Sequence, residues 1–217
     1  MVSLRIVGNE VTALGTAALA MPLRPFLWRD AAFDPQFPHP TPVVLVHGFL
    51  GDPTNFLAIR GRLAAQGIRN FASFSYPPRF DYQRLAPRLG EAIEALCFAT
   101  GVPQVDVVGH SMGGLIARYL LELGGGGRIR RLVTLGAPYF STALSMRELA
   151  IFGAYDPLIP APHPVYGPHG RTVVVPDCGH WGLLYHSMVS DEAVRFLAVP
   201  PRALAAPTPP ALEAAAS

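Results

Sequence analysis

The chain has 217 residues, of which 50% are hydrophobic and 15% are charged, so it reads as one globular domain and neither a disordered tail nor a charged coiled coil. The formal net charge of +2 comes from 17 basic and 15 acidic residues, which is too balanced for a protein that grips phosphate backbones, and we expect no nucleic-acid partner. All of the basic residues are Arg, and the absence of Lys excludes Schiff-base chemistry and a P-loop.

Residues 1–41 form an N-terminal extension with two readings. An apolar stretch at residues 11–23 is too short to span a bilayer, but it has the length of a signal-peptide apolar region, with Arg5 ahead of it and Ala18-Leu19-Ala20 as a cleavage site. Glu10 directly before the stretch speaks against a signal. A surface or membrane-lying helix is the alternative, and both readings favour a secreted or membrane-associated protein over a cytoplasmic one.

Residues 42–198 alternate short apolar runs with helical patterns. Strands are predicted at residues 43–46, 70–76, 105–108, 132–135, 149–152 and 172–175, and helices at residues 55–66, 83–100, 115–123 and 190–197. The connections are too long for hairpins, so the predicted fold is a doubly wound α/β domain with a mostly parallel sheet of about six strands, flanked by helices. Functional groups of such folds gather at the carboxyl edge of the sheet.

The remaining features concern the end of the chain and the two cysteines. Residues 199–217 alternate Ala and Pro without a periodic apolar face, which predicts a disordered tail. Cys97 and Cys178 cannot form a disulfide framework or a four-cysteine zinc site. We expect two buried free thiols, since buried Cys behaves as a small hydrophobe.

The residues Gly109-His110-Ser111-Met112-Gly113 directly follow the third predicted strand and match the G-x-S-x-G nucleophile elbow. The turn holds the serine in a strained conformation, and flanking glycines are needed where a Cβ would collide with the strand or helix. It lifts the Ser111 hydroxyl into the cleft and points the Met112 amide at the reacting carbonyl oxygen from a helix N-terminus. Ser111 is therefore the predicted nucleophile.

A serine hydroxyl needs a base, and the expected chain order is serine, then acid, then histidine. His180 lies in a turn just after the last predicted strand and is the predicted base. His186 follows it and reads as a surface side chain, whereas His163 and His169 sit in a Pro-rich loop. The other three histidines precede Ser111 and are excluded by the order: His39, His47 and His110.

Asp156 follows the fifth predicted strand and is the predicted acid, because it can approach the imidazole from a neighbouring strand. Asp177 is the alternative, since it lies three residues from His180 on the same loop. Asp106 reads as a polar residue at a strand start.

The second donor of an oxyanion hole should come from the glycine-containing loop after the first predicted strand. The Phe49 amide is the candidate, to be paired with Met112. His47 reads as an imidazole that hydrogen-bonds its own loop into shape.

Four motifs carry a resemblance to a known family: VVLVHGF at 43–49, VDVVGHSMGG at 105–114, LVTLGAP at 132–138 and GHWGLLY at 179–185. They resemble the α/β-hydrolase superfamily, and specifically the minimal, lidless lipases of Bacillus type, over residues 42–197. The resemblance implies the same roles for Ser111, His180, Asp156, Phe49 and Met112. The N-terminal extension, the Ala/Pro tail and the Pro- and His-rich segment 160–170 depart from the family pattern.

The two segments that could carry a cap domain, residues 137–149 and 156–172, are too short for one, so we expect an open cleft without a cap. Apolar side chains at its rim suit an acyl chain, because burying one methylene contributes about 0.8 kcal/mol. The predicted substrate-binding residues are Leu50, Leu158, Ile159 and Trp181, and the predicted rim also includes Phe49, Met112 and Leu184. Each of these side chains could instead belong to the core, and Leu184 fits either place equally well.

These features predict a serine carboxylic ester hydrolase, a lipase or esterase, that works through an acyl-enzyme on an ester or lipid and requires no metal or organic cofactor. An acyltransferase, a thioesterase or a polyester hydrolase would use the same triad, and a catalytically dead hydrolase fold used for binding is the alternative of another class. Peripheral contact with a membrane or lipid surface is a further expectation. The sequence specifies neither acyl chain length nor oligomeric state.

Overall fold

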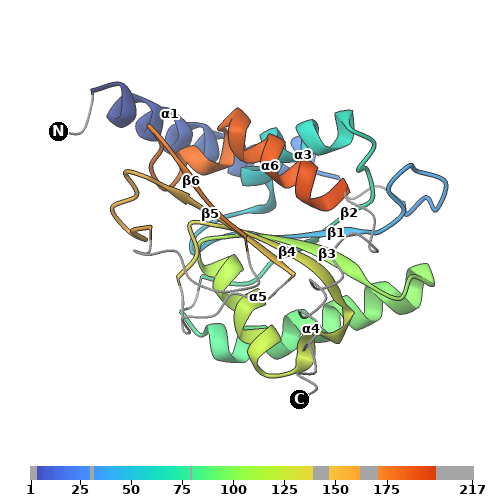
Figure 1. The fold of residues 1–217 in the computed structure, drawn as a ribbon. Coiled ribbons are helices and arrows are strands. Elements are labelled where there is room, and N and C mark those ends of the chain that lie inside the picture. The colour runs from blue at the N-terminus through green and yellow to red at the C-terminus, as the bar shows by residue number, and fades with distance from the viewer. Residues whose placement is uncertain (1–3, 30–31, 79, 139–146, 162–170, 199–217) are drawn as a thin grey trace, which may run out of the picture.

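A central parallel sheet organises the chain in a computed structural model that describes residues 4–29, 32–78, 80–138, 147–161 and 171–198. Its six strands are all parallel and run in the order β2-β1-β3-β4-β5-β6 (Figure 1). The predicted fold class is therefore confirmed. The strands are β1 (Val43–Val46), β2 (Phe71–Phe74), β3 (Val105–His110), β4 (Ile129–Leu135), β5 (Glu148–Gly153) and β6 (Arg171–Val175).

Helices cover both faces of the sheet. On one face lie α3 (Leu57–Ala65) and α6 (Ser187–Ala198), and on the other lie α4 (Tyr82–Thr100) and α5 (Met112–Glu122) (Figure 1). Short 3₁₀ helices occur at Pro53–Phe56 (η2), Gly125–Arg128 (η3) and Gly182–Leu184 (η4).

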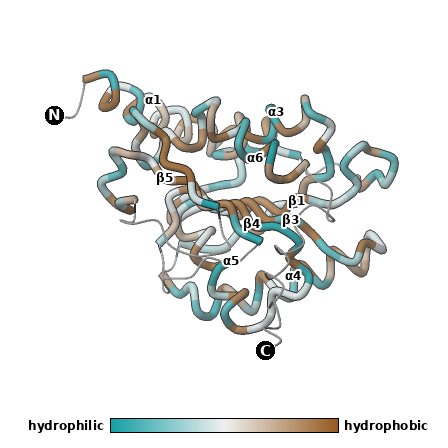
Figure 2. The backbone as a smooth tube through the Cα atoms, viewed as in Figure 1, coloured by the Kyte–Doolittle hydropathy of each residue, from teal (hydrophilic) through white to brown (hydrophobic). Residues whose placement is uncertain are grey.

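Alternate side chains of each central strand enter the two cores. In β1, Val43 and Leu45 pack with α3 and α6, whereas Val44 and Val46 pack with α4 and α5. Strands covered on both faces are mostly apolar, which is why β1 is hydrophobic at every position (Figure 2). The same property made the strands recognisable in the sequence.

The strand and helix ends differ from prediction by a few residues. The starts of α5, α6 and β4 each lie three residues earlier than predicted, and β4 begins at Ile129 instead of residue 132. Its two arginines obscured the start: Arg131 is fully buried with a bond to the carbonyl of Leu197, and Arg130 pairs with buried Asp106. The end of α4, in contrast, was predicted correctly: the helix ends at Thr100, directly before Gly101, whose φ of 71° is typical of a glycine that ends a helix.

The N-terminal segment forms a surface helix, α1 (Leu4–Ala20), followed by η1 (Met21–Leu23) and α2 (Arg24–Leu27). Its inward face is formed mainly by small residues, which allow a close approach to the rest of the protein: Ile6, Ala13, Ala17 and Ala20 are buried. By length and composition alone, Leu4–Leu27 is also long and apolar enough to cross a membrane. In the structure, α1 lies against the same side of the molecule as α6 (Figure 1).

The two cysteines are buried and unpaired, as predicted. The predicted tail at residues 199–217 and the loop residues His163 and His169 lie outside the described residues.

Candidate active site

Ser111 sits at the sharp turn between β3 and α5. Its φ of 53° and ψ of −122° are a strained combination for a residue with a side chain, and its amide donates to the carbonyl of Leu135 at 2.8 Å. A Cβ on Gly109 would lie 2.6 Å from the Gly114 nitrogen, and one on Gly113 would overlap the carbonyl oxygens of the chain at the end of β1. The predicted steric need for glycine at this turn is thus borne out.

His180 and Asp156 form a buried pair at the carboxyl edge of the sheet. The His180 Nδ1 and Asp156 Oδ2 atoms are 2.7 Å apart, and both residues are buried. The other carboxylate oxygen, Oδ1, accepts hydrogen bonds from the amides of Leu158 and Ile159, each at 2.8 Å. An ionised carboxylate only accepts, so Nδ1 carries the proton and Nε2 is left as an acceptor.

The alternative acid does not make this contact. Asp177 is exposed, with a φ of 53°, and the His180 imidazole is bonded to Asp156 instead.

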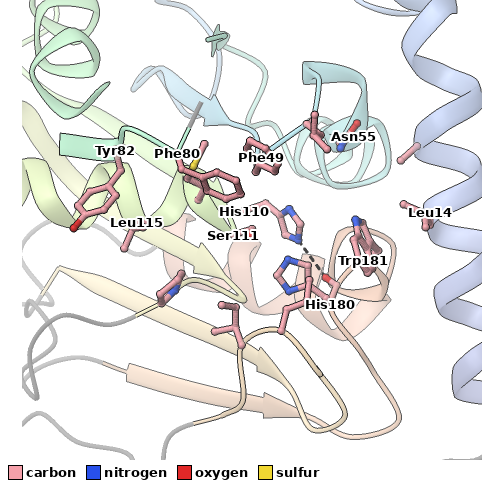
Figure 3. Close-up of a pocket in the computed structure, with 18 of the residues that line it drawn as sticks. Leu14, Phe49, Asn55, Phe80, Tyr82, His110, Ser111, Leu115, His180 and Trp181 are labelled. Atoms are coloured by element: carbon pink, nitrogen blue, oxygen red, sulfur yellow. Dashed lines mark hydrogen bonds between the residues drawn. The ribbon is translucent and has the colours of Figure 1, made fainter. Parts of the chain in front are cut away.

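Ser111 and His180 line one cavity, and their side chains lie near each other in Figure 3. Within the described part of the chain, the Ser111 hydroxyl makes no hydrogen bond to the His180 ring. Catalytic hydrogen bonds are often long in the absence of substrate and shorten when it binds. The arrangement is suited to nucleophilic attack by Ser111 with His180 as its base.

Two further histidines, His110 and His47, bond backbone carbonyls next to the site. Burial lowers the pKa of His110 to about 3, helped by neighbouring His180, so His110 is neutral and its Nε2 donates to the carbonyl of His180 at 3.2 Å. Burial also lowers the pKa of His47, whose Nδ1 bonds the carbonyl of Gly48 at 2.9 Å. His47 therefore holds its own loop, as expected from the sequence. Tyr76 stacks on His47 and donates to its carbonyl.

The two candidate oxyanion donors flank the same cavity. Met112 is the first residue of α5, so its amide is at the positive end of a helix. Phe49 belongs to the loop after β1. This loop forms a tight turn in which the Gly51 amide donates to the Gly48 carbonyl at 3.0 Å and Leu50 has a φ of 57°. The Phe49 ring stacks on Phe80 at 3.8 Å.

The cavity has a volume of about 830 Å³, and most of its lining is apolar. It is within the size range of small-molecule sites. All four predicted substrate-binding residues line it: Leu50, Leu158, Ile159 and Trp181. Of the two places expected for Leu184, the structure shows the core: its side chain is fully buried beneath α6 and does not line the cavity.

One wall of the cavity was not foreseen. Leu14, Ala17, Ala18 and Met21 line it from the N-terminal segment, and Leu14 points towards the site from α1 (Figure 3). Among the described residues no cap domain covers the cleft, and α1 borders it on one side. Glu10 is the one acidic residue of α1, and this was the sequence signal that could have indicated an inward-facing role.

Other candidate groups are accounted for by structural contacts. Burial raises the pKa of the Cys178 thiol to about 12, so it stays protonated and is a poor nucleophile. His39 bonds Asp106 at 3.0 Å far from the cavity lining. His186 is half-buried, and its Nδ1 accepts a hydrogen bond from the Met188 amide near the start of α6.

Comparisons with known proteins agree with the fold. The family model described as the alpha/beta hydrolase fold matches residues 41–158, more than half of the chain. The structure is similar to that of a mature Bacillus licheniformis lipase, with a TM-score of 0.61 and 13% identity over 80% of this chain and 97% of that one.

Two more solved structures share the fold. An esterase from Thermogutta terrifontis has a TM-score of 0.55 and 18% identity, covering 73% of this chain and 91% of that one. The 2-hydroxy-6-oxo-6-phenylhexa-2,4-dienoate hydrolase of a Rhodococcus strain has a TM-score of 0.56 and 17% identity, covering 76% and 92%. Identities this low show a shared fold, while the substrate has to be argued from the site.

Proposed function

Because this chain belongs to the α/β-hydrolase fold family, we propose that its hydrolytic centre is a Ser111-His180-Asp156 triad and that it cleaves carboxylic esters. One observation carries the proposal: the buried 2.7 Å bond between His180 and Asp156 lies at the same cavity as the strained Ser111. That bond leaves the His180 Nε2 free to accept the Ser111 proton. The structural likenesses to a lipase and to an esterase support the class of reaction.

The first half of the reaction forms an acyl-enzyme. The Ser111 hydroxyl oxygen attacks the ester carbonyl carbon while its proton passes to His180 Nε2, and the Asp156 carboxylate stabilises the imidazolium. The oxyanion accepts hydrogen bonds from the Phe49 and Met112 amides, and loss of one such donor typically costs about 2.7–4 kcal/mol. His180 then gives its proton to the departing alcohol.

The second half returns the enzyme to its starting state. Water enters, loses a proton to His180 and attacks the acyl carbon, and collapse of the intermediate returns the proton to Ser111 and releases the acid. Among the described residues that line the cavity there is no Arg, Asp or Glu, so the acyl group it suits is apolar.

The test is hydrolysis of p-nitrophenyl esters from acetate to palmitate. We expect p-nitrophenol release by the parent protein and none above the uncatalysed rate from Ser111→Ala, with a matched fold by circular dichroism. The chain-length profile separates an esterase from a lipase. A parent protein without activity on any of these esters would favour the catalytically dead binding fold, and transfer of the acyl group to an added alcohol in preference to water would favour an acyltransferase.

We also propose that the cavity opens onto a lipid surface. The outward side of α1 carries an apolar strip at helical spacing, with exposed Leu4, Val7, Val11 and Leu14. Leu14 belongs to both the strip and the cavity wall, so the strip is continuous with the mouth through which an ester enters. The cavity mouth adds three exposed apolar side chains: Leu50, Phe80 and Leu158.

Charge supports a lipid as the occupant of this surface. Between residues 4 and 29 there are three arginines, Arg5, Arg24 and Arg29, of which Arg24 pairs with Asp52 at 3.2 Å, and one acid, Glu10. The acid is turned inward and bonded to backbone amides. A basic segment with an apolar strip is complementary to an anionic bilayer.

Co-sedimentation with phosphatidylcholine vesicles containing phosphatidylglycerol tests this contact. We expect the Val7→Asn, Val11→Asn double variant to bind vesicles about tenfold more weakly than the parent, since two apolar side chains no longer enter the lipid. Phe98→Asn is the matched control, because Phe98 is 93% exposed on α4, across the sheet. An equal loss of vesicle binding in the control would count against the proposal. So would a parent protein that does not bind vesicles and forms a dimer instead.

A further inference from the structure

Glu10 lies on the inward side of α1 and binds the loop that carries His180. Its Oε1 atom accepts hydrogen bonds from the amides of Gly179 at 3.1 Å and Gly182 at 2.8 Å. Its Oε2 atom accepts one from the amide of Trp181 at 2.8 Å. Bonds from amides to a carboxylate are charge-assisted and about twice as strong as neutral ones. One side chain near the N-terminus thus holds three amides on both sides of His180.

The rest of the His180 loop is held from the sheet. The carbonyl of Cys178 accepts from the Tyr155 amide at 3.0 Å, just after β5, and the carbonyl of His180 accepts from His110 at the end of β3. The loop's carbonyls are therefore fixed by strand ends, while the three amides are fixed by α1. Without Glu10 the three amides would lose the carboxylate that accepts their hydrogen bonds.

Two glycines leave room for the carboxylate. A Cβ on Gly179 would lie 2.5 Å from Glu10 Cδ, and a Cβ on Gly182 would overlap Glu10 Oε1. Neither glycine has a positive φ, so the backbone conformation does not require glycine at these positions. The space that the Glu10 carboxylate occupies explains why both positions are glycine.

We propose that Glu10 is a positioning residue for His180 and that α1 is a working part of the active site. The proposal depends on the proposed ester hydrolysis by Ser111 and His180. Glu10 lines no part of the cavity and acts through the loop backbone, which sets where the His180 ring stands relative to Ser111. Cleavage after Ala20 would remove Glu10, so an enzyme processed there has a lower turnover than the chain that keeps α1.

The first experiment measures kcat and KM with p-nitrophenyl butyrate for Glu10→Ala, Glu10→Gln and the control Asn9→Ala. We expect Glu10→Ala to lower kcat at least tenfold with KM changed less than threefold. Glu10→Gln should retain part of the rate, because an amide oxygen can still accept from Gly179 and Gly182. Asn9 is exposed on the same helix and should have no effect.

A spectroscopic readout separates positioning from a general loss of stability. The downfield proton resonance of the His180 to Asp156 hydrogen bond should be sharp in the parent and in Asn9→Ala, and shifted or broadened in Glu10→Ala. A Glu10→Ala enzyme with kcat within twofold of the parent, or with an unchanged resonance, would overturn the proposal. If the parent hydrolysed no ester, the proposed function would fail, and the resonance alone would still decide whether Glu10 orders His180.

Gly182→Ala provides an independent route that leaves α1 intact. The added methyl group displaces the Glu10 carboxylate, so kcat should fall by a factor similar to that of Glu10→Ala. In the Glu10→Ala background the nearest remaining contact of the same methyl group is Cys178 Sγ at 3.2 Å, so the methyl group should lower kcat no more than twofold further. Independent, multiplying losses in the double variant would contradict a shared cause.

Discussion

Asp156 uses both carboxylate oxygens, one for His180 and one for two backbone amides of its own loop. This division fixes which oxygen faces the imidazole, and it makes the effect of an amide predictable. In Asp156→Asn the amide oxygen takes the bonds from Leu158 and Ile159, so the amide nitrogen faces His180.

We expect Asp156→Asn to lower kcat by roughly 10⁴-fold with little change in melting temperature. An amide nitrogen only donates, so His180 must present an unprotonated Nδ1 and a protonated Nε2, which cannot accept the Ser111 proton. Steady-state hydrolysis of p-nitrophenyl butyrate measures the loss. A fall of less than tenfold would exclude Asp156 as the residue that sets the tautomer.

His110 leads to a prediction about pH and stability. Its pKa is about 3 in the folded protein against 6.5 for an ordinary His, so between these values the unfolded chain binds a proton that the folded one does not. The free energy of unfolding should therefore be highest above pH 6.5 and fall towards pH 3, by up to about 1.4 kcal/mol per pH unit from this residue.

Urea denaturation between pH 4 and 7 measures this slope in the parent and in His110→Gln. Glutamine keeps a donor for the His180 carbonyl but does not titrate, so the variant should have a shallower slope. An unchanged slope would mean that burial of His110 is not its source.

The sequence predicted the chemical residues better than the groups that support them. Ser111, Asp156 and His180 follow strand ends in a recognisable order, and the fold brings the last two into contact. Glu10 could not be found in that way, because its partners are backbone amides about 170 residues further along the chain. Backbone amides leave no pattern in a sequence.

At the scale of elements, the turn between β3 and α5 depends on close backbone contact. A Cβ on Gly113 would overlap the carbonyl oxygens of Val46 and His47, which belong to the backbone and cannot swing away. We expect Gly113→Ala to lower the free energy of unfolding by about 1–3 kcal/mol or more, with loss of activity.

Gly61→Ala is the matched control for that variant, since Gly61 lies in α3 with no atom within 4 Å of the added methyl group. It should raise the free energy of unfolding by about 0.5–1 kcal/mol, as replacement of a helical glycine generally does. Equal stabilities for the two variants in urea denaturation would show that contact at Gly113 does not limit the turn.

A strand that is apolar throughout was predicted more closely than one that begins with two arginines. Strand β1 is apolar throughout and was predicted with its observed ends. The start of β4 was missed because Arg130 and Arg131 are stabilised by distant partners, Asp106 and the end of α6. A buried arginine is unusual enough that a sequence pattern favours a loop.

At the scale of the whole molecule, the parallel sheet places every predicted chemical group at one edge. That arrangement follows from topology and could be predicted from the alternation of strands and helices. The shape of the cleft could not, because the docking of α1 beside it depends on contacts between the two ends of the described chain. The cavity therefore has a wall that sequence motifs did not reveal.

The most direct measurement of the central claim is trapping of the acyl-enzyme. The protein is mixed with p-nitrophenyl butyrate, quenched in acid within one turnover, and analysed by peptide mass spectrometry. The account predicts a mass increase of one butyryl group on the peptide that contains Ser111, absent in Ser111→Ala. Ester cleavage without any modified peptide, or a butyryl group on another residue at the same rate, would contradict it.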